Sequence, residues 1–342
     1  MTSAPAAPDR YDLLVMGRLG VDLYPLELRT TLEAAQTFSK SLGGSAANVA
    51  VAAARHGLRT ALVSATGDDP FGRYLHAELR RLGVDDRYVG RRSEYQTPLT
   101  FCEIFPPDRF PLQFYREPIA PDLTITGDDL DDVAIVRARI LWLTATGLSR
   151  EPSRTAHHRA LDYRQMDPLA EQSRREVRHT VLDLDYRAGF WPSPGHAARE
   201  LAEVLPRVTA VVGNLEECAV AVGEDSPEAA ADALLSRGPG LAVVKLGADG
   251  VLAVTAEQRL RIPAYRLPVV NGLGAGDGFG GALCRGLLAG WPLEQALDFA
   301  AAAGAIVASR RECSTAMPTG EEVAGLCARR APDSDPQPPS DP

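Results

Sequence analysis

The chain has 342 residues, and 36 lysines and arginines against 45 aspartates and glutamates give it a formal charge of −9. This acidic balance argues against nucleic acid as the main partner. A hydrophobic fraction of 45% can furnish a sizeable core, which excludes disorder as the dominant state. The length is compatible with two domains or with one α/β unit.

No apolar run is long enough to cross a membrane, and the first residues, MTSAPAAPDR, lack the features of a secretory signal, so we expect a cytoplasmic protein. The five cysteines are scattered and lack CxxC spacing, which favours reduced thiols over a disulfide framework or a zinc site. We expect disordered tails at residues 1–10 and 331–342, flanking one domain over residues 11–330.

Short apolar runs typical of strands alternate with helical stretches along the chain. The first run is followed by a helix that Ser45 is positioned to cap and Gly57 to end, and another helix runs from Pro70 to Gly83. This alternation predicts an α/β fold with a doubly wound, mostly parallel sheet and helices on both faces. The apolar runs lie at residues 11–17, 60–67, 139–147, 180–186, 209–214 and 241–247.

Residues 97–117 break the alternation, because two strand-like runs are joined by the turn PPDR with no helix between them. This pattern predicts a hairpin, which is either a small β lid over a ligand site or an edge extension of the main sheet. The hairpin could pair with that of a second copy, which predicts a homodimer. Residues 121–132 hold five aspartates and no basic residue, so we expect an acidic surface segment there.

The most informative segment is LPVVNGLGAGDGFGGALCRGLLAG, in which an apolar run enters a glycine turn and then a helix. The glycines allow close approach of an anion, and the free amides near Ala275, Gly276 and Asp277 would point toward it. A carboxylate at this place would repel phosphate, but it makes sense as the base for a hydroxyl that attacks a phosphate. The alternative is that Asp277 caps the helix and the glycines only make a turn.

Other phosphate-binding motifs are missing or misplaced in the sequence. No GxxxxGK[ST] is present, which excludes a P-loop enzyme. A GxGxxG pattern at Gly276, Gly278 and Gly281 lies inside the predicted helix instead of at a strand–helix turn. The dinucleotide-binding interpretation is therefore weak.

A second glycine site lies near the N-terminus. Asp22 follows the first predicted strand, while Gly43 and Gly44 precede a helix that carries Asn48. Carboxylate and amide side chains suit sugar hydroxyls, and glycines leave room for a polyol. The alternative is a pair of turn glycines beside an asparagine that is satisfied within its helix.

Several spaced motifs, in order across roughly residues 11–320, resemble the ribokinase-like (pfkB) carbohydrate kinases, which implies a ribokinase-like three-layer fold. Within this family the chain is similar to the 5-dehydro-2-deoxygluconokinases of myo-inositol breakdown, through TFCEIFPPDRFPLQFYREPIAPDL, VLDLDYRAGFWPS and CRGLLAGWPLEQAL. The family motifs are GRLGVDLYP, SLGGSAANVAVAAARHG, VVGNLEECAVAVG, VVKLGADG and VVNGLGAGDGFGGALCRG.

The resemblance implies an ATP-dependent kinase that phosphorylates a primary hydroxyl of a sugar acid, with 5-dehydro-2-deoxy-D-gluconate as the specific acceptor. It makes Asp277 the catalytic base and assigns the anion hole for the transferred phosphoryl group to Gly274, Ala275 and Gly276. The implied nucleotide-binding residues are Lys245, Gly247 and Gly250.

The family pattern also implies metal sites. Its N-x-x-E motif falls on Asn214 and Glu217, which would organise Mg²⁺ through water, because this ion dehydrates reluctantly. The alternative is a strand-end asparagine beside a surface glutamate. Where the family often has an aspartate linked to a monovalent-cation site, this chain has Asn271, which puts potassium activation in doubt. Ala301 replaces an asparagine common on the adenine side, so we expect apolar or backbone contacts there.

For the acceptor, the resemblance implies two kinds of contact. Arg116 and Arg187 fall where related sugar-acid kinases place arginines against a carboxylate, and bidentate pairing makes this role physically apt. Surface salt bridges remain the alternative, since arginine is abundant in this chain. The residues implied to hold the rest of the acceptor are Asp22, Gly43, Gly44 and Asn48.

Three other functions stay open from the sequence. The first two are a kinase for 2-keto-3-deoxygluconate and a kinase for a neutral sugar such as ribose or fructose. The third, of another class, is a non-catalytic sugar-sensing module on a kinase scaffold. The presence of base, anion-hole and metal motifs together favours an enzyme.

Overall fold

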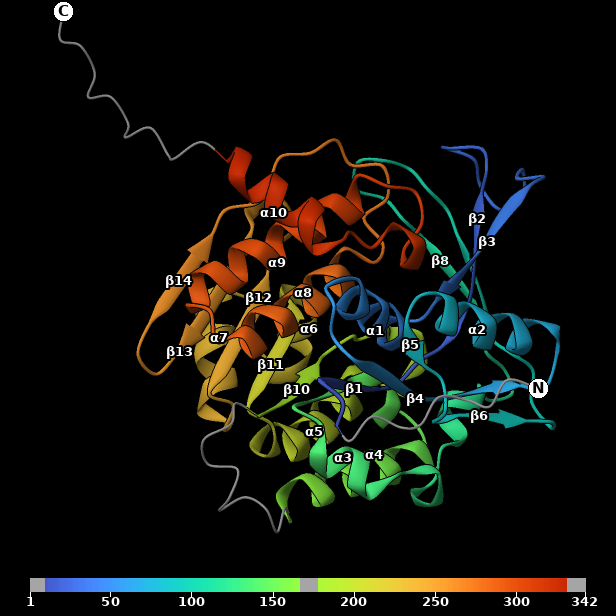
Figure 1. The fold of residues 1–342 in the computed structure, drawn as a ribbon, viewed down its shortest axis with the longest axis horizontal. Helices are drawn as coiled ribbons and strands as arrows, with labels where there is room; N and C mark the ends of the chain where they lie inside the picture. Colours follow the sequence, from blue (N-terminus) through green and yellow to red (C-terminus); the bar gives the residue numbers. More distant parts are fainter. Residues whose placement is uncertain (1–9, 167–177, 331–342) are drawn as a thin grey trace, which may run out of the picture.

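A ten-stranded, mostly parallel sheet forms the centre of the molecule (Figure 1). The computed structural model describes residues 10–166 and 178–330, so the predicted tails, except for Arg10, lie outside the described residues. The strand order is β14-β13-β12-β11-β10-β9-β1-β4-β5, with β6 paired to β4. The strands are β1 (Leu13–Met16), β4 (Thr60–Gly67), β5 (Val84–Asp85), β6 (Val89–Arg92), β9 (Ile140–Thr144), β10 (His179–Asp183), β11 (Ala210–Asn214), β12 (Leu241–Lys245), β13 (Val251–Thr255) and β14 (Arg259–Ile262).

Helices cover both faces of this sheet, as predicted from the alternation, and each face has its own apolar core. Alternate residues of β1 divide between the two cores, with Leu13 and Val15 in one and Leu14 and Met16 in the other. The first face carries α1 (Ser45–Arg55), α2 (Pro70–Arg81), α8 (Ala275–Ala289), α9 (Leu293–Ala308) and α10 (Gly320–Arg329). The second carries α3 (Asp132–Arg137), α4 (Ser153–Gln165), α5 (Pro194–Val204), α6 (Leu215–Val222) and α7 (Pro227–Ser236).

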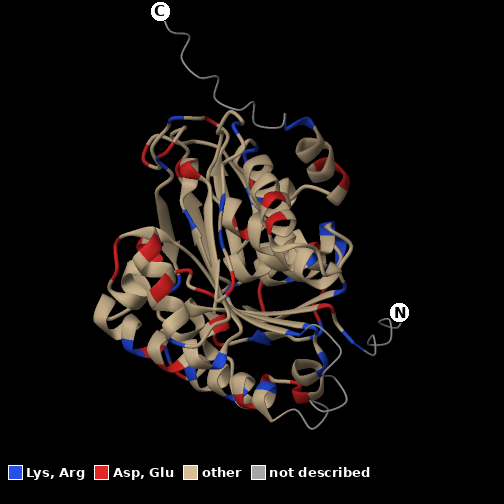
Figure 2. Cartoon of the chain, turned by 90° about the vertical axis from the view of Figure 1, so that its left-hand side faces the viewer, with Lys and Arg blue, Asp and Glu red and all other residues tan. Residues whose placement is uncertain are grey.

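Neighbouring strands β9 to β12 run parallel to β1, so their carboxyl ends meet at one edge of the sheet. Most of the length of the central strands carries no charged residue (Figure 2). Polar and charged side chains stand where the strands end, and Asp183, Asn214 and Lys245 are the last residues of β10, β11 and β12. This edge is where a doubly wound fold binds its ligands.

Close packing between α1 and α8 brings two distant sequence motifs together. A Cβ added at Gly281 would lie 2.5 Å from the Ala52 Cβ, and one at Gly280 would lie 2.8 Å from the Trp142 ring. Only glycine fits such contacts without displacement. The middle of α8 is thereby held against α1 and β9.

A second, four-stranded sheet stands beside the first, in the order β3-β2-β7-β8. The predicted hairpin forms β7 and β8, which pair antiparallel, and β7 also pairs parallel with β2. The hairpin therefore belongs to a separate small sheet and does not extend the main one (Figure 1). The homodimer expected through this lid stays a prediction. The lid strands are β2 (Gly20–Pro25), β3 (Phe38–Gly43), β7 (Leu99–Cys102) and β8 (Leu112–Tyr115).

The acidic segment at residues 121–132 is not entirely a surface feature. Its first aspartate, Asp122, is only 2% exposed, and its two carboxylate oxygens accept hydrogen bonds from Arg116 Nη2 at 2.7 and 3.0 Å. The expectation of a surface segment is wrong at this position, because the 3-10 turn Pro121–Thr124 packs against β4 and α4. The same part of the chain therefore supplies a buried counter-charge for a lid arginine.

All five cysteines are free thiols, as expected from their spacing. Within residues 10–166 and 178–330, none of the helices combines the length and apolar character needed to cross a membrane.

Candidate active site

Asp277 lies in the first turn of α8, and two side chains of α1 hold its carboxylate by hydrogen bonds. Ser45 Oγ donates to Asp277 Oδ1 and Asn48 Nδ2 donates to Asp277 Oδ2, both at 2.8 Å. The cap position of α8 is Gly274, and no side chain caps this helix, so the capping interpretation of Asp277 is wrong. The predicted cap by Ser45 is also wrong, because Gly44 occupies the cap position of α1 and the Ser45 hydroxyl is committed to Asp277.

Burial raises the pKa of Asp277 above the usual value of an aspartate. Hydrogen bonds from Asn48 and Ser45 and the charge of Lys245 oppose this rise, while the negative charge of Asp185 adds to it. Each carboxylate oxygen keeps a lone pair beyond its one protein donor. The group can therefore take up a proton from a ligand hydroxyl.

The backbone at the start of α8 forms a site for an anion. The first turn of the helix is closed by a 2.9 Å hydrogen bond from the Gly278 N–H to the Gly274 carbonyl oxygen. The amides of Gly276 and Asp277 come before this bond, so they are free of the hydrogen bonds within the helix. Gly276 lies directly against Lys245, since an added Cβ would be 3.1 Å from Nζ. Free amides, the positive end of the helix dipole and an ammonium group therefore converge at one place.

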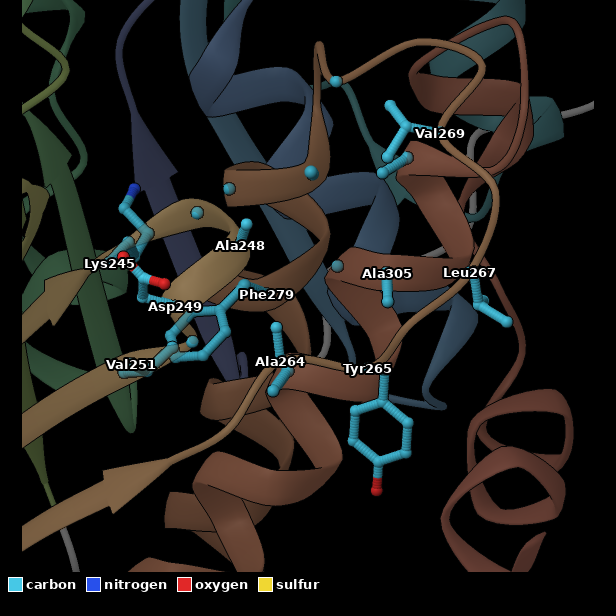
Figure 3. Close-up of a pocket in the computed structure, with 18 of the residues that line it drawn as sticks. Lys245, Ala248, Asp249, Val251, Ala264, Tyr265, Leu267, Val269, Phe279 and Ala305 are labelled. Carbon is cyan, nitrogen blue, oxygen red and sulfur yellow. The ribbon is translucent and has the colours of Figure 1, made fainter. Parts of the chain in front are cut away.

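A cavity of about 850 Å³ opens from this anion site (Figure 3). It brings together the predicted residues Lys245, Gly247, Gly250, Ala275 and Gly276. Its size is that of a small-molecule site, and a mostly apolar wall with a few polar groups at one end suits a nucleotide. Further wall residues are Val251, Ala264, Tyr265, Leu267, Val269, Ala301 and Ala305, of which the sequence indicated only Ala301.

Asp22, on the lid strand β2, lies next to the glycine pair. A Cβ at Gly43 would come within 2.1 Å of the Asp22 carboxylate, and Gly44 adopts a φ of 97° that favours glycine. The Tyr24 hydroxyl donates to Asp22 Oδ2 at 3.0 Å. Burial raises the pKa of Asp22 to about 6, against the opposing effect of the Tyr24 hydrogen bond. Three of the predicted acceptor residues, Asp22, Gly43 and Gly44, are therefore close together, and Asn48 joins Asp277.

The predicted carboxylate-binding arginines both have protein partners. Arg116 donates to the buried Asp122, and Arg187 forms ion pairs with Asp185 Oδ1 at 3.2 Å and Glu217 Oε1 at 3.7 Å. A third arginine, Arg18, donates through Nε and Nη2 to Asp185 Oδ2 at 3.2 and 2.7 Å. Arg18 was not among the predicted site residues, although its place two residues after β1 was a usable signal.

Asn214 and Glu217 form a reciprocal capping box at the start of α6. The Glu217 N–H donates to Asn214 Oδ1, and the Asn214 N–H donates to Glu217 Oε2, both at 2.8 Å. Glu217 is only 4% exposed, so the alternative of a surface glutamate is wrong. Its second oxygen, Oε1, takes no part in the box. Metal binding by Asn214 and Glu217 stays a prediction.

Carboxylates gather at the strand ends beside this box. Asp183 and Asp185 are each 3% exposed, and Lys245 Nζ is 4.0 Å from Asp183 Oδ1. Burial and the negative charges of Glu217 and Asp185 raise the pKa of Asp183, while Lys245 opposes the rise. Arg18, Arg187 and Lys245 lie against these carboxylates, so their negative charges are largely balanced within the protein.

The loop before α8 is tied by Asn271, the residue that replaces the expected aspartate. Asn271 is fully buried, its Nδ2 donates to the Arg311 carbonyl at 2.6 Å, and its Oδ1 accepts from the Leu273 N–H at 3.1 Å. Both ends of the amide are used inside the loop. A neutral side chain that is hydrogen-bonded within its loop attracts a monovalent cation less strongly than a carboxylate would.

Comparison with known proteins decides the family of this site. A model described as pfkB family carbohydrate kinase matches residues 11–320, nearly the whole of the described chain. The chain belongs to the pfkB family of carbohydrate kinases. This pfkB kinase is 33% identical over 321 residues to the 5-dehydro-2-deoxygluconokinase of Shouchella clausii, covering 93% of this chain and 95% of the relative. It is 31% identical to the Bacillus subtilis protein of the same name, covering 92% and 95%.

Solved structures of pfkB kinases share the fold. The fructokinase of Xylella fastidiosa, crystallised with bound ATP, has a TM-score of 0.79 at 26% identity, covering 93% of this chain and 98% of that one. A putative ribokinase II from E. coli, in complex with ATP and Mg²⁺, has a TM-score of 0.83 at 20% identity, covering 94% and 100%. The predicted ribokinase-like fold is therefore confirmed, and the protein is a sugar kinase, a phosphotransferase with an alcohol group as acceptor.

Proposed function

We propose that this pfkB kinase transfers the γ-phosphoryl group of ATP to the primary hydroxyl of 5-dehydro-2-deoxy-D-gluconate, a step of myo-inositol catabolism. The observation that carries the proposal is the Asp277 carboxylate, fixed by Ser45 and Asn48 beside free amides and Lys245. A base next to an anion site is the arrangement that phosphoryl transfer to a hydroxyl requires. The relatives named for this activity, identical at 31–33% over nearly the whole chain, support the acceptor.

In this proposal ATP occupies the cavity beside α8 and α9, with its base against the apolar wall that includes Ala301. Its terminal phosphate lies toward the anion hole at Gly274, Ala275 and Gly276 and toward the Lys245 ammonium. The Ala275 N–H donates to the Gly272 carbonyl at 3.4 Å, so the Gly276 amide is the one left for the phosphate. Asp277 accepts the proton of the attacking hydroxyl as the new phosphate ester forms. The amides and Lys245 stabilise the charge that spreads over the transferred phosphoryl oxygens.

The acceptor lies on the other side of Asp277, toward the lid. Asp22 accepts hydrogen bonds from its hydroxyl groups, while Gly43 and Gly44 leave room for the carbon chain. Asn48 fixes Asp277 and borders the same space. The lid sheet, which carries Asp22, shields the reaction from water.

The residues at the strand ends fit a Mg²⁺ ion held through water. Glu217 Oε1 is outside the capping box and the Asp183 carboxylate is buried nearby, so both can accept hydrogen bonds from the water shell of the ion. Asn214 and Glu217 would hold the ion, which when bound neutralises phosphate charge. The capping box keeps both side chains oriented whether or not an ion is present.

The test is ADP release by the purified chain with ATP, Mg²⁺ and a panel of acceptors. The panel contains 5-dehydro-2-deoxy-D-gluconate, 2-keto-3-deoxygluconate, ribose and fructose. We expect the highest kcat/KM with the first compound. A clear preference for another acceptor would overturn the assigned substrate, and thermal stabilisation by sugars without any ADP release would favour a sensing module.

A further inference from the structure

Arg18 is a buried cation whose direct partner, Asp185, is shared with a second arginine. It is 6% exposed, and its guanidinium donates through Nε and Nη2 to one oxygen of Asp185. The other oxygen of Asp185 pairs with Arg187 at 3.2 Å, so one carboxylate serves two guanidinium groups. Within the described residues, Arg18 Nη1 makes no hydrogen bond. Nη1 is not among the fully buried polar atoms that lack a partner, so this end of the guanidinium stays accessible to a ligand acceptor.

Aromatic rings hold this guanidinium toward the lid. The Arg18 Cζ lies 5.9 Å from the ring centroid of Phe114, on β8, and 5.6 Å from that of Phe190. The two rings meet edge to face with their centroids 4.8 Å apart. Arg116 approaches the same Phe190 ring, with its Cζ 5.0 Å from the centroid. Two guanidinium groups therefore flank one aromatic pair, at the junction of lid and core.

The position of Arg18 relative to the reacting groups suits one end of the acceptor. Its carbonyl oxygen backs on Gly44, where an added Cβ would lie 2.5 Å away. The charges of Asp185, Asp122 and Asp277 raise the pKa of Arg18 against the effect of burial, which agrees with its place between the lid and α8. In a six-carbon sugar acid the carboxylate and the primary hydroxyl are at opposite ends. With the hydroxyl at Asp277, the carboxylate must lie some distance away, toward the lid.

We propose that Arg18 is a specificity-determining residue that binds the acceptor carboxylate together with Arg116. This inference rests on the proposed function, because it requires an acidic acceptor. Phe114 and Phe190 keep water from the ion pair and fix the planes of the guanidinium groups. Arg187, which the sequence pointed to, instead shares Asp185 with Arg18 and orients it.

The test compares Arg18→Gln and Arg18→Lys with wild type, using 5-dehydro-2-deoxy-D-gluconate as substrate. Its carboxamide, which keeps the primary hydroxyl, is the neutral competing acceptor, and its Ki is measured against formation of the phosphorylated acid. In Arg18→Gln we expect the KM for the acid to rise roughly 10- to 100-fold, the loss expected for a hydrogen bond to a charged group. The Ki of the carboxamide and the KM for ATP should change by less than about threefold. Arg18→Lys keeps the charge without the planar fork, so its KM for the acid should lie between those of wild type and Arg18→Gln.

Arg139→Gln is the matched control, because Arg139 also pairs with an aspartate, Asp12, but precedes β9 at the opposite edge of the sheet. It should leave every constant unchanged. A parallel rise of the ATP KM and the carboxamide Ki in the Arg18 variants would overturn the inference in favour of a structural role. An unchanged acid KM would overturn it as well, and Arg18→Lys supplies this test if Arg18→Gln does not fold. Failure of the wild type to phosphorylate the acid would overturn the proposed function itself, and is seen before any variant is made.

Discussion

Substitution of Gly43 by alanine tests whether Asp22 contacts the acceptor. The added Cβ would lie 2.1 Å from the Asp22 carboxylate, so the carboxylate must move by roughly 1.3 Å to reach ordinary contact. Such a shift breaks the 3.0 Å hydrogen bond from Tyr24 and removes Asp22 from its position against the acceptor. Loss of one hydrogen bond to a charged group costs about 2 kcal/mol, which is about 30-fold in the acceptor KM at 25 °C.

The assay is the initial rate of ADP release, with acceptor and ATP varied in turn. The acceptor KM should rise by this amount, while the ATP KM stays at its wild-type value because Gly43 is not among the residues that line the nucleotide cavity. Gly195→Ala is the matched control, since the atoms nearest to its added Cβ are 4.0 Å away. An unchanged acceptor KM, or an equal rise in both KM values, would refute the assignment of Asp22.

Three further variants probe other parts of the site. Tyr24→Phe removes a hydrogen bond that lowers the pKa of Asp22, so this pKa should rise. In wild type the kcat/KM for the acceptor should fall on acidification around pH 6, and in the variant this fall should begin at a higher pH. Superimposable pH profiles would contradict this. Ala301→Glu places a carboxylate in the apolar wall of the nucleotide cavity. The KM for ATP should rise about tenfold or more, while the KM for the acceptor stays unaltered. A normal KM for ATP would count against ATP binding in this cavity. Glu217→Gln keeps the capping box but removes the negative charge. The Mg²⁺ concentration that gives the half-maximal rate should rise, while the melting temperature stays within a few degrees of the wild-type value. An unchanged Mg²⁺ requirement would remove Glu217 from the metal site.

Regular apolar runs made the fold largely predictable. The strands β1, β4, β9, β11 and β12 lie inside the predicted apolar runs, and β10 begins one residue before its run, because buried parallel strands are nearly uniformly apolar. The lid was only half predicted. Its hairpin was visible, but β2 and β3 carry polar residues, and their sheet depends on the long-range parallel pairing of β2 with β7.

The site was predictable where glycines and carboxylates follow an apolar run in the sequence, as at Asp22 and Asp277. Residues from irregular segments were not: the cavity wall around Tyr265 and Val269 comes from the stretch between β14 and α8, which has no periodicity to read. Arg18 was hidden by the abundance of arginine, since its role depends on Phe190, which is distant in sequence. Buried partners such as Asp122 likewise depend on tertiary contacts.

The central claim is that Asp277 is the base for phosphoryl transfer, and Asp277→Asn tests it most directly. Asparagine is the same size and can still bond to Ser45 and Asn48, so the fold and both binding sites should be retained. The decisive measurement is kcat for ADP release at saturating ATP and acceptor. We predict a fall of about 10²- to 10⁴-fold with ATP and acceptor binding preserved. A kcat close to that of wild type would contradict the account.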